Sequence, residues 1–348
     1  MQGIRRYAAH ASEGAPPDRS LDGSAYAGHT SCPDLFQISR AARLFSAGAR
    51  YGTVLQNVRA ASLISELASS LKAAAAGEFN GGRWRGQPGQ LQAMVAVYAY
   101  PDTDALAQDL GEYIVAQQDA ALAAHGQFAV AVSGGSLVGV LAAALLHGPA
   151  AARVRWAQWH VFFCDERLVP LEHAESNYHA LRTQLLDPLA AAGALGPVVH
   201  SFNEALLGQG ANERIAEAYE AQLPVALDLA LLGAGPDGHT ASLFPGPAHA
   251  WMLDERRARV LWCRDSPKPP ADRITLTLPA LEAAAAVAFV AEGTAKRPVL
   301  ERALVRRDPA LPCAVVTARC ARVAWFTTAA TVQDLPLQTA AYCASSRT

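Results

Sequence analysis

The sequence predicts an α/β protein with a mostly parallel sheet that is covered by helices on both faces. Short runs of Val, Leu, Ile and Phe without polar alternation recur from residue 94 onward, which is typical of strands buried on both sides. Segments of helical character separate these runs, as in a series of βαβ units, and the crossovers should be right-handed. A glycine-rich turn directly follows two of the runs, where such sheets bind ligands.

The individual elements follow from these patterns. We expect strands at residues 93–100, 128–132, 159–167, 228–235, 273–278 and 287–293. We expect helices at residues 102–122, 136–146, 176–189, 281–285 and 294–305. Asp102 or Thr103 can cap the first helix and Ser176 the third, because their side-chain oxygens accept hydrogen bonds from free backbone N–H groups. Pro298 must lie early in its helix or kink it. Residues 313–318 close the series.

Composition limits the class of protein and its partners. The 348 residues are 51% hydrophobic and 17% charged with a net charge of −2, as in an ordinary globular protein. This balance gives no reason to expect nucleic acid or an anionic membrane as a partner. No apolar run approaches the roughly 18 residues of a membrane span. The six cysteines lack CxxC or ligand spacing, so we expect no metal site and no disulfide framework. No heptad or apolar stripe argues for assembly, and we expect a monomer.

The N-terminal part of the chain differs in character. Residues 35–65 contain four arginines and no acidic residue, a profile that is typical of an organelle transit peptide. The alternative is a disordered extension without a targeting role. The glycine-rich segment 77–90 is expected to be a linker. We therefore expect residues 1–92 to be a largely disordered extension, 93–333 the folded domain and 334–348 a tail. A plastid is the expected location, with mitochondrion or cytoplasm as alternatives.

Three polar segments follow predicted strands, at the edge where parallel sheets bind ligands. The first is the turn Ser133, Gly134, Gly135 and Ser136. Its glycines permit close backbone approach, and the amides of the following helix attract an anion, so it is a candidate phosphate site. The alternative is a turn that only packs helix against strand. The second segment contains Asp165, Glu166 and Arg167. The Arg167 guanidinium can grip a phosphate with paired hydrogen bonds, or it can form an ion pair with Asp165.

The third segment has the spacing Gly233-x-Gly235-x-x-Gly238 and then His239. This spacing also occurs in dinucleotide-binding loops, and an acidic residue about 20 positions further on agrees with that function. However, residues 245–247 are Pro-Gly-Pro, which ends any helix that could point at a pyrophosphate, and the loop comes late in the chain. We therefore favour His239 as a base that takes a proton from water near neutral pH, with loop amides near an oxyanion. The alternative is a histidine that only bonds Asp237 or the backbone.

Four segments, in the same order, resemble the 6-phosphogluconolactonase family. They are 131–145, 162–186, 231–246 and 265–284, within a resemblance that covers about residues 94–330. The resemblance implies a Rossmann-like fold similar to that of sugar-phosphate isomerases and CoA transferases. It also implies hydrolysis of 6-phospho-D-glucono-1,5-lactone, a phosphosugar lactone, in the oxidative pentose phosphate pathway that supplies NADPH, with no cofactor and no metal.

The resemblance also implies roles for single residues. His239 matches the general base of the family, and Arg167 and Lys268 match cations that face the substrate phosphate. Lys268 is one of only three lysines and lies in a proline-rich loop that loses little entropy on binding. The turn at 133–136 matches the phosphate-binding turn of the family. Arg273 is a weaker candidate for substrate binding, and the alternative is that it serves only to anchor the start of its strand. Apart from the resemblance, Asp165, Asp237, Gly235 and Gly238 are expected to support the site, and the sequence leaves open whether Asp165, Asp237 or Glu166 orients His239.

Two alternatives to a lactonase stay open. A glucosamine-6-phosphate deaminase or sugar-phosphate isomerase shares the glycine-rich loop with histidine. Such deaminases continue that loop with Asn-Glu-Pro, where this chain has Leu243-Phe244-Pro245 after Ser242, and they lack the Asp-Glu-Arg-Leu-Val-Pro run. The second alternative is a module that binds a phosphosugar without catalysis.

Overall fold

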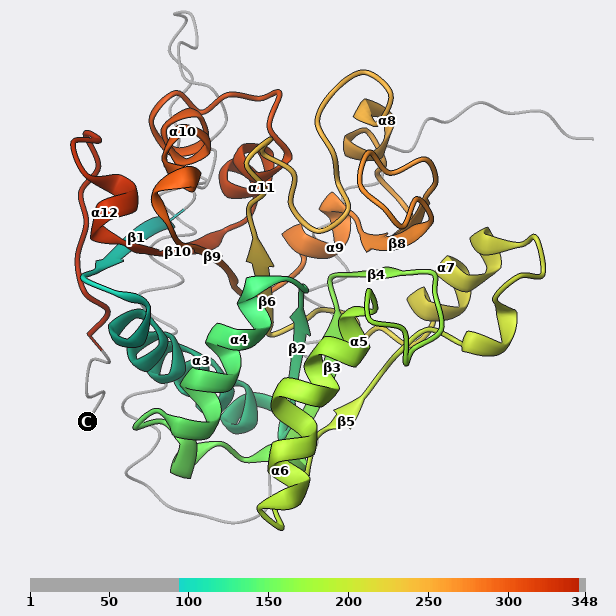
Figure 1. The fold of residues 1–348 in the computed structure, drawn as a ribbon, viewed down its shortest axis with the longest axis horizontal. Coiled ribbons are helices and arrows are strands. Elements are labelled where there is room, and N and C mark those ends of the chain that lie inside the picture. Colours follow the sequence, from blue (N-terminus) through green and yellow to red (C-terminus); the bar gives the residue numbers. More distant parts are fainter. Residues whose placement is uncertain (1–93, 344–348) are drawn as a thin grey trace, which may run out of the picture. The chain divides into compact units, whose positions relative to one another are not determined.

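The computed structural model describes residues 94–343, and its centre is a seven-stranded parallel sheet (Figure 1). In chain order its strands are β1 (Met94–Tyr100), β2 (Phe128–Val132), β3 (Trp159–Phe163), β5 (Val198–Val199), β6 (Leu229–Gly233), β9 (Val287–Ala291) and β10 (Arg322–Thr328). The strands lie side by side in the order β1-β10-β9-β6-β2-β3-β5, and every neighbouring pair is parallel. The predicted fold class is confirmed.

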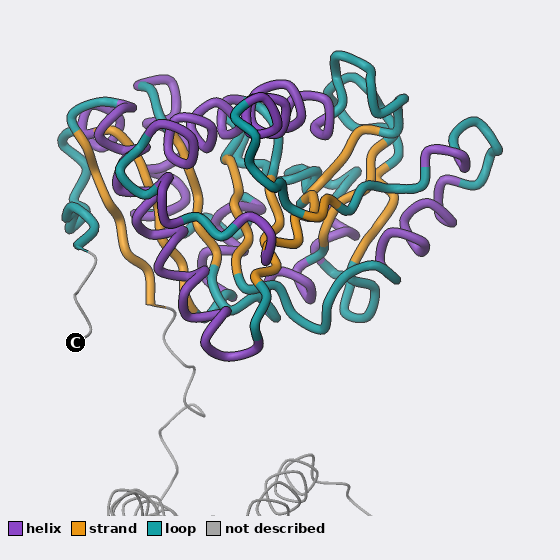
Figure 2. The backbone as a smooth tube through the Cα atoms, turned by 90° about the horizontal axis from the view of Figure 1, so that it is seen from below, coloured by secondary structure: helices purple, strands orange, loops and turns teal. Residues whose placement is uncertain are grey.

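Helices cover both sides of this sheet (Figure 2). They are α3 (Thr103–His125), α4 (Ser136–Ala142), α5 (Asn177–Leu181), α6 (Asp187–Ala191), α7 (Asn212–Glu220), α8 (Ala250–Leu253), α9 (Leu278–Glu282), α10 (Arg297–Leu300), α11 (Pro312–Arg319) and α12 (Ala329–Val332). The chain steps one way along the sheet from β1 to β5 and the other way from β6 to β10. With right-handed crossovers, α3 to α6 therefore belong to one face, and α7 and α9 to α11 to the other.

The helix starts agree with the sequence signals. The Asp102 side chain accepts a hydrogen bond from the Ala105 amide at 2.8 Å and caps α3. Ser176 caps α5 by accepting from the His179 amide at 3.2 Å. Pro298 lies in the first turn of α10, where its missing N–H leaves no intrahelical bond unmade. The predicted caps and the early position of Pro298 are thus confirmed.

A second sheet of three antiparallel strands corrects two predictions. It consists of β4 (Asp165–Arg167), β7 (Val260–Cys263) and β8 (Arg273–Leu276), in the order β4-β8-β7. The expected single strand 159–167 breaks at Cys164, and its charged end leaves the large sheet to pair with β8. The expected strand 273–278 belongs to this small sheet and stops at 276, because Thr277 caps α9.

The end of the chain differs from the predicted pattern as well. Residues 313–318, expected to close the series, lie within α11, and the last strand is β10, which the pattern does not predict. The expected tail is packed in its described part: the Ala99 amide donates to the Ala340 carbonyl at 3.1 Å, and Tyr342 contacts Tyr98 edge to face. The expected transit peptide and linker lie outside the described residues.

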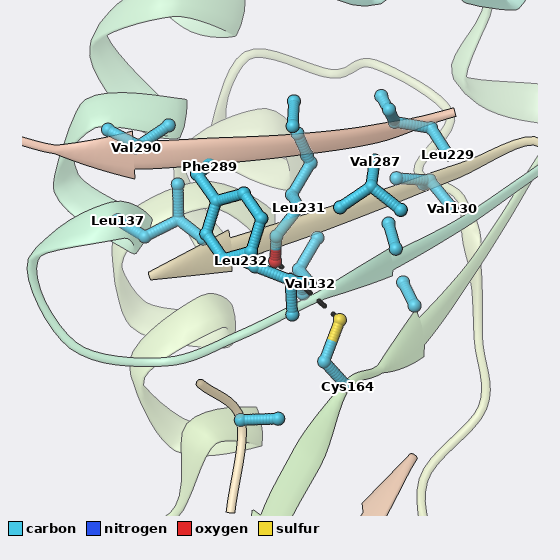
Figure 3. Packing of buried hydrophobic residues seen from close by; sticks show 14 of the residues in the cluster. Val130, Val132, Leu137, Cys164, Leu229, Leu231, Leu232, Val287, Phe289 and Val290 are labelled. Atoms are coloured by element: carbon cyan, nitrogen blue, oxygen red, sulfur yellow. Dashed lines mark hydrogen bonds between the residues drawn. The ribbon is translucent and has the colours of Figure 1, made fainter. Parts of the chain in front are cut away.

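The core consists of the side chains that fill both faces of the large sheet. Leu231, Val132 and Phe289 project from neighbouring strands and are almost completely buried (Figure 3). Phe289 stacks on Trp325 with ring centroids 4.1 Å apart, which joins β9 to β10. The Cys164 thiol donates to the Leu231 carbonyl at 3.6 Å. Within residues 94–343, no helix is both long and apolar enough to cross a bilayer.

Candidate functional site

The order of the strands places the site. The large sheet changes direction between β2 and β6, because β2 leads on to β3 on one side and β6 to β9 on the other (Figure 1). Loops that leave the carboxyl ends of two such strands diverge and leave a crevice between them. A cavity of about 250 Å³ lies there, lined by the turn after β2 and the loop after β6. Its charged lining residues are Asp165, Arg167, Lys268, Arg273, Glu292 and Lys296, four cations against two anions.

The turn after β2 presents its backbone to the cavity. Gly135 has φ 76° and ψ −151°, a conformation that side-chain-bearing residues avoid. Gly134 has no room for a side chain, since a Cβ atom there would lie 1.9 Å from the Oδ1 atom of Asn177. The amides of Ser136 and Leu137 belong to the first turn of α4, where no intrahelical acceptor exists. This turn therefore has the geometry of an anion site, as the sequence suggests.

Arg167 and Ser133 each have a buried polar atom without a hydrogen-bond partner among the described residues. Arg167 donates through Nη1 to the Glu175 carbonyl, yet its Nε is buried without a hydrogen-bond partner among the described residues. Ser133 Oγ is also buried, with only the weak Cys164 thiol nearby. The alternative ion pair of Arg167 with Asp165 is not formed in the described part of the chain, and the Asp165 carboxylate accepts from Ser242 Oγ at 2.8 Å instead. Buried donors without partners in a cavity wall suit a ligand anion.

Glu166 fixes two of these lining residues from behind. Its carboxylate accepts hydrogen bonds from the amides of Arg167, Asn177 and Tyr178 at 2.7 Å and from Ser176 Oγ at 3.1 Å. Burial raises the pKa of Glu166 to about 6, while these bonds act in the opposite direction. The carboxylate thus holds the start of α5 against β4. Asn177 lines the cavity from this position, and the sequence analysis did not single it out.

The loop after β6 is closed by its own amides. The Gly235 amide donates to the His239 carbonyl at 2.8 Å, and the Gly238 amide donates to the Gly235 carbonyl at 2.9 Å. Gly238 has φ 91°, which permits this tight turn. Both amides belong to the stretch 235–238 that the sequence analysis expects near a reaction oxyanion, and both are used within the loop. Their part is to shape the loop that carries His239.

The His239 ring lies directly against the backbone of Gly235. A Cβ atom at Gly235 would lie 1.9 Å from both Nδ1 and Cε1 of the ring. The ring also packs against Phe244, with ring centroids 5.0 Å apart. The imidazole thus contacts both a glycine backbone and an aromatic ring, and it lines the cavity.

Two charged side chains meet the Nδ1 atom of His239. Asp237 Oδ1 is hydrogen-bonded to it, and the Lys268 ammonium lies 3.0 Å from it and 3.5 Å from Asp237 Oδ1. We assign the Nδ1 proton to the bond with Asp237, which leaves the Nε2 lone pair as the basic position. Burial lowers the pKa of His239, Asp237 opposes this through its hydrogen bond and charge, and Lys268 lowers it further. The ring is thus neutral at neutral pH, as a base must be.

Lys296 is a cation of the site that the sequence analysis did not single out. Its ammonium donates to the Ala234 carbonyl at 2.7 Å and lines the same cavity. Burial lowers its pKa, and the nearby Lys268 acts in the same direction. Its position at the turn before α10 could be found only once β9 is known to lie beside β6. Two of the three lysines of the chain, Lys268 and Lys296, therefore line the same cavity.

The loop with the Gly-x-Gly-x-x-Gly spacing does not lead into a helix. The next helix, α8, begins at Ala250 and has four residues. The Gly235 and Gly238 amides are used within the loop, and no helix starts here to face a pyrophosphate, so the structure does not favour a dinucleotide at this loop. Within residues 94–343, no three His, Cys, Asp or Glu side chains are grouped to hold a metal ion.

Comparisons with known proteins identify the family of the chain. The family model described as glucosamine-6-phosphate isomerases/6-phosphogluconolactonase matches residues 101–325. The chain is 45% identical over 237 residues to 6-phosphogluconolactonase 3 of Saccharomyces cerevisiae, covering 67% of this chain and 94% of that one. It is 42% identical over 243 residues to rat 6-phosphogluconolactonase, with coverages of 67% and 90%. The solved structure of Trypanosoma brucei 6-phosphogluconolactonase is similar, with a TM-score of 0.59, 26% identity, and coverage of 70% and 99%.

The contacts of His239 predict how its protonation responds to one substitution. Because Asp237 stabilises the protonated ring, Asp237→Asn should lower the pKa of His239 below its wild-type value. An NMR titration of the His239 Cε1–H signal measures this pKa. The control is Asp254→Asn, a change at an exposed carboxylate paired with Arg256. An unchanged titration in Asp237→Asn would contradict the assigned hydrogen bond.

Proposed function

Because the chain belongs to the glucosamine-6-phosphate isomerase and 6-phosphogluconolactonase family, we propose that it hydrolyses 6-phospho-D-glucono-1,5-lactone to 6-phospho-D-gluconate. This is a reaction of the oxidative pentose phosphate pathway. The observation that carries the proposal is one cavity lined by His239 on one wall and by the turn at 133–136, with the start of α4, on another. A lactone is already activated toward attack by water, so one base and a firm grip on the substrate suffice for its opening.

Binding of the substrate depends on its phosphate. The free amides at the start of α4, the Arg167 guanidinium, and the ammonium groups of Lys268 and Lys296 line the cavity and can donate to it. Four cations against two anions in the cavity wall favour a dianionic group electrostatically. Fixing the phosphate also fixes the lactone ring, which removes much of the entropy cost of bringing water and C1 together.

The chemical step uses His239 twice. Its Nε2 takes a proton from water while the water oxygen forms a bond to C1, and the carbonyl electrons move onto oxygen. When this oxyanion collapses, the bond from C1 to the ring oxygen breaks, and the imidazolium returns the proton to that oxygen. Asp237 stabilises the imidazolium in between, as an orienting carboxylate does in a catalytic triad.

A deaminase or isomerase is the second candidate, and two observations count against it. The loop after His239 runs through Leu243 and Phe244, which are completely buried, where the deaminases carry Asn-Glu-Pro. The relatives with 40–45% identity bear the name 6-phosphogluconolactonase. An activity panel with fresh lactone, glucosamine 6-phosphate and ribose 5-phosphate decides between them. The lactone also opens unaided, so each trace needs a control without enzyme, and a binding module would not exceed that control.

Removal of the base should slow the chemical step. We expect His239→Asn to lower kcat by about 10²- to 10⁴-fold with little change in KM, because general-base catalysis is lost while the binding groups stay. It should also remove the decline of activity at acid pH, since that decline reflects protonation of a histidine whose pKa is lowered. The exposed His147 serves as control, and His147→Asn should behave as wild type. Wild-type kcat in His239→Asn would end the base assignment.

Removal of the phosphate donor should act on binding instead. Arg167→Ala is expected to raise KM for the phosphorylated lactone by about tenfold or more, as the loss of a charge-assisted bond implies. The hydrolysis of unphosphorylated gluconolactone should change little. Arg182→Ala, at an arginine paired with Glu172 outside the cavity lining, is the matched control. Equal loss with both substrates would mean that Arg167 has another role.

We further propose that residues 1–92 direct the chain to a plastid. The support is the stretch 35–65 with four arginines and no acidic residue. A fluorescent protein fused behind residues 1–92 should accumulate in plastids, and a version with the four arginines changed to glutamine should stay in the cytoplasm. Mitochondrial or cytoplasmic fluorescence of the unchanged fusion would replace this proposal by one of its alternatives.

A further inference from the structure

Arg273 is a buried cation whose donors are used by the protein itself. The residue is 3% exposed, although it lines the cavity. Its guanidinium donates to the carbonyls of Lys268, Pro269 and Pro270 at 2.9, 3.0 and 3.0 Å, and to Ser242 Oγ at 3.4 Å. No carboxylate of the described residues pairs with it within 4.0 Å. Four of its five N–H groups are thus directed at neutral protein acceptors, which leaves little capacity to bind a substrate.

These bonds determine the position of Lys268. Three consecutive carbonyls, of residues 268, 269 and 270, converge on one guanidinium, so the path of the loop is fixed from inside. Ser266 closes the other side, because its Oγ donates to the Lys268 carbonyl at 2.9 Å and accepts from the Lys268 amide at 3.2 Å. The backbone of Lys268 is therefore held at several points, and its ammonium reaches the Nδ1 atom of His239 at 3.0 Å.

The charges that face His239 come from three segments. Asp237 lies in its own loop, Lys268 in the loop before β8, and Asp165 in β4. The two carboxylates favour the protonated ring, and Lys268 is the cation that disfavours it. Phe244 covers one side of the ring without a charge. Moving the Lys268 ammonium away from His239 therefore raises the pKa of the imidazole.

We propose that Arg273 is a positioning residue, which holds the 268–270 loop so that the Lys268 ammonium stays beside the catalytic histidine. This rests on the proposed function for its effect on turnover, and it replaces the expected direct contact of Arg273 with substrate. Arg273 acts through Lys268, and the conservative change to lysine cannot restore it, because an ammonium cannot reach three carbonyls in the fork geometry of a guanidinium.

The test compares Arg273→Gln, Arg273→Lys and Lys268→Met with wild type. In an NMR titration without substrate, each variant should raise the pKa of His239 by about half a unit or more, as expected when a like charge beside the ring moves away. The pKa of His239 in the double variant Lys268→Met/Arg273→Gln should not exceed its pKa in Lys268→Met. Arg264→Gln, at an exposed arginine of the same segment, is the control. A wild-type pKa in Arg273→Gln, or additive shifts in the double variant, would overturn the proposal.

Kinetics separate this role from direct binding. A positioning role predicts that the acid limb of the kcat profile moves to higher pH in Arg273→Lys with both the phosphorylated and the unphosphorylated lactone. A phosphate ligand would instead raise KM for the phosphorylated lactone alone and leave the acid limb in place, and that result would refute the proposal. If Arg273→Gln does not fold, as judged by circular dichroism, the pKa of His239 and the acid limb are compared between Arg273→Lys and wild type instead. Because the NMR titration needs no substrate, it holds or fails independently of the lactonase reaction.

Discussion

The contact between an imidazole and a bare backbone is the constraint on which the site depends. The His239 ring occupies the space that a Cβ atom of Gly235 would need, so this position excludes every residue with a side chain. The glycine in turn lies at the end of β6, beside the reversal of strand order that opens the cavity. Phe244 packs against the same ring and further restricts its position, and the Asp237 bond selects its tautomer. A short loop thereby performs the orientation that catalytic triads spread over distant segments.

Three of the four cations that line the cavity, Arg167, Arg273 and Lys296, form hydrogen bonds with neutral groups of the protein rather than with carboxylates of the described residues. Carbonyl oxygens solvate Arg273 and the Lys296 ammonium, and the Nε of Arg167 has no partner in the described residues. Pairing these cations with carboxylates would lower their free energy, but it would also cancel the potential that attracts an anion. The buried carboxylate of Glu166 illustrates the alternative, since it accepts amides and a hydroxyl and thereby leaves the neighbouring arginine unneutralised.

The sequence could predict the parts of this molecule that local pattern determines. The buried strands β1, β2, β3, β6 and β9 and the caps Asp102 and Ser176 follow from periodicity and side-chain chemistry, and the residues after β2 and β6 do meet in one cavity. Pairing between distant segments could not be predicted this way. The charged end of the third strand pairs with β8 across more than a hundred residues, and that antiparallel partner has the same apolar pattern as a parallel strand. Lys296 was missed for the same reason, since its place depends on β9 lying beside β6.

The two glycine-rich loops of the site divide the work that one loop performs in dinucleotide-binding proteins. The turn after β2 leads straight into α4, and the amides of its first turn stay free for an anion. The loop after β6 has the spacing of a nucleotide fingerprint, but its glycine amides close the loop on itself and no helix follows directly. Its glycines therefore make room for a side chain rather than for a phosphate. The spacing of the glycines determines how closely another group can approach the backbone. Whether the backbone amides are free or already hydrogen-bonded determines whether that group can be an anion.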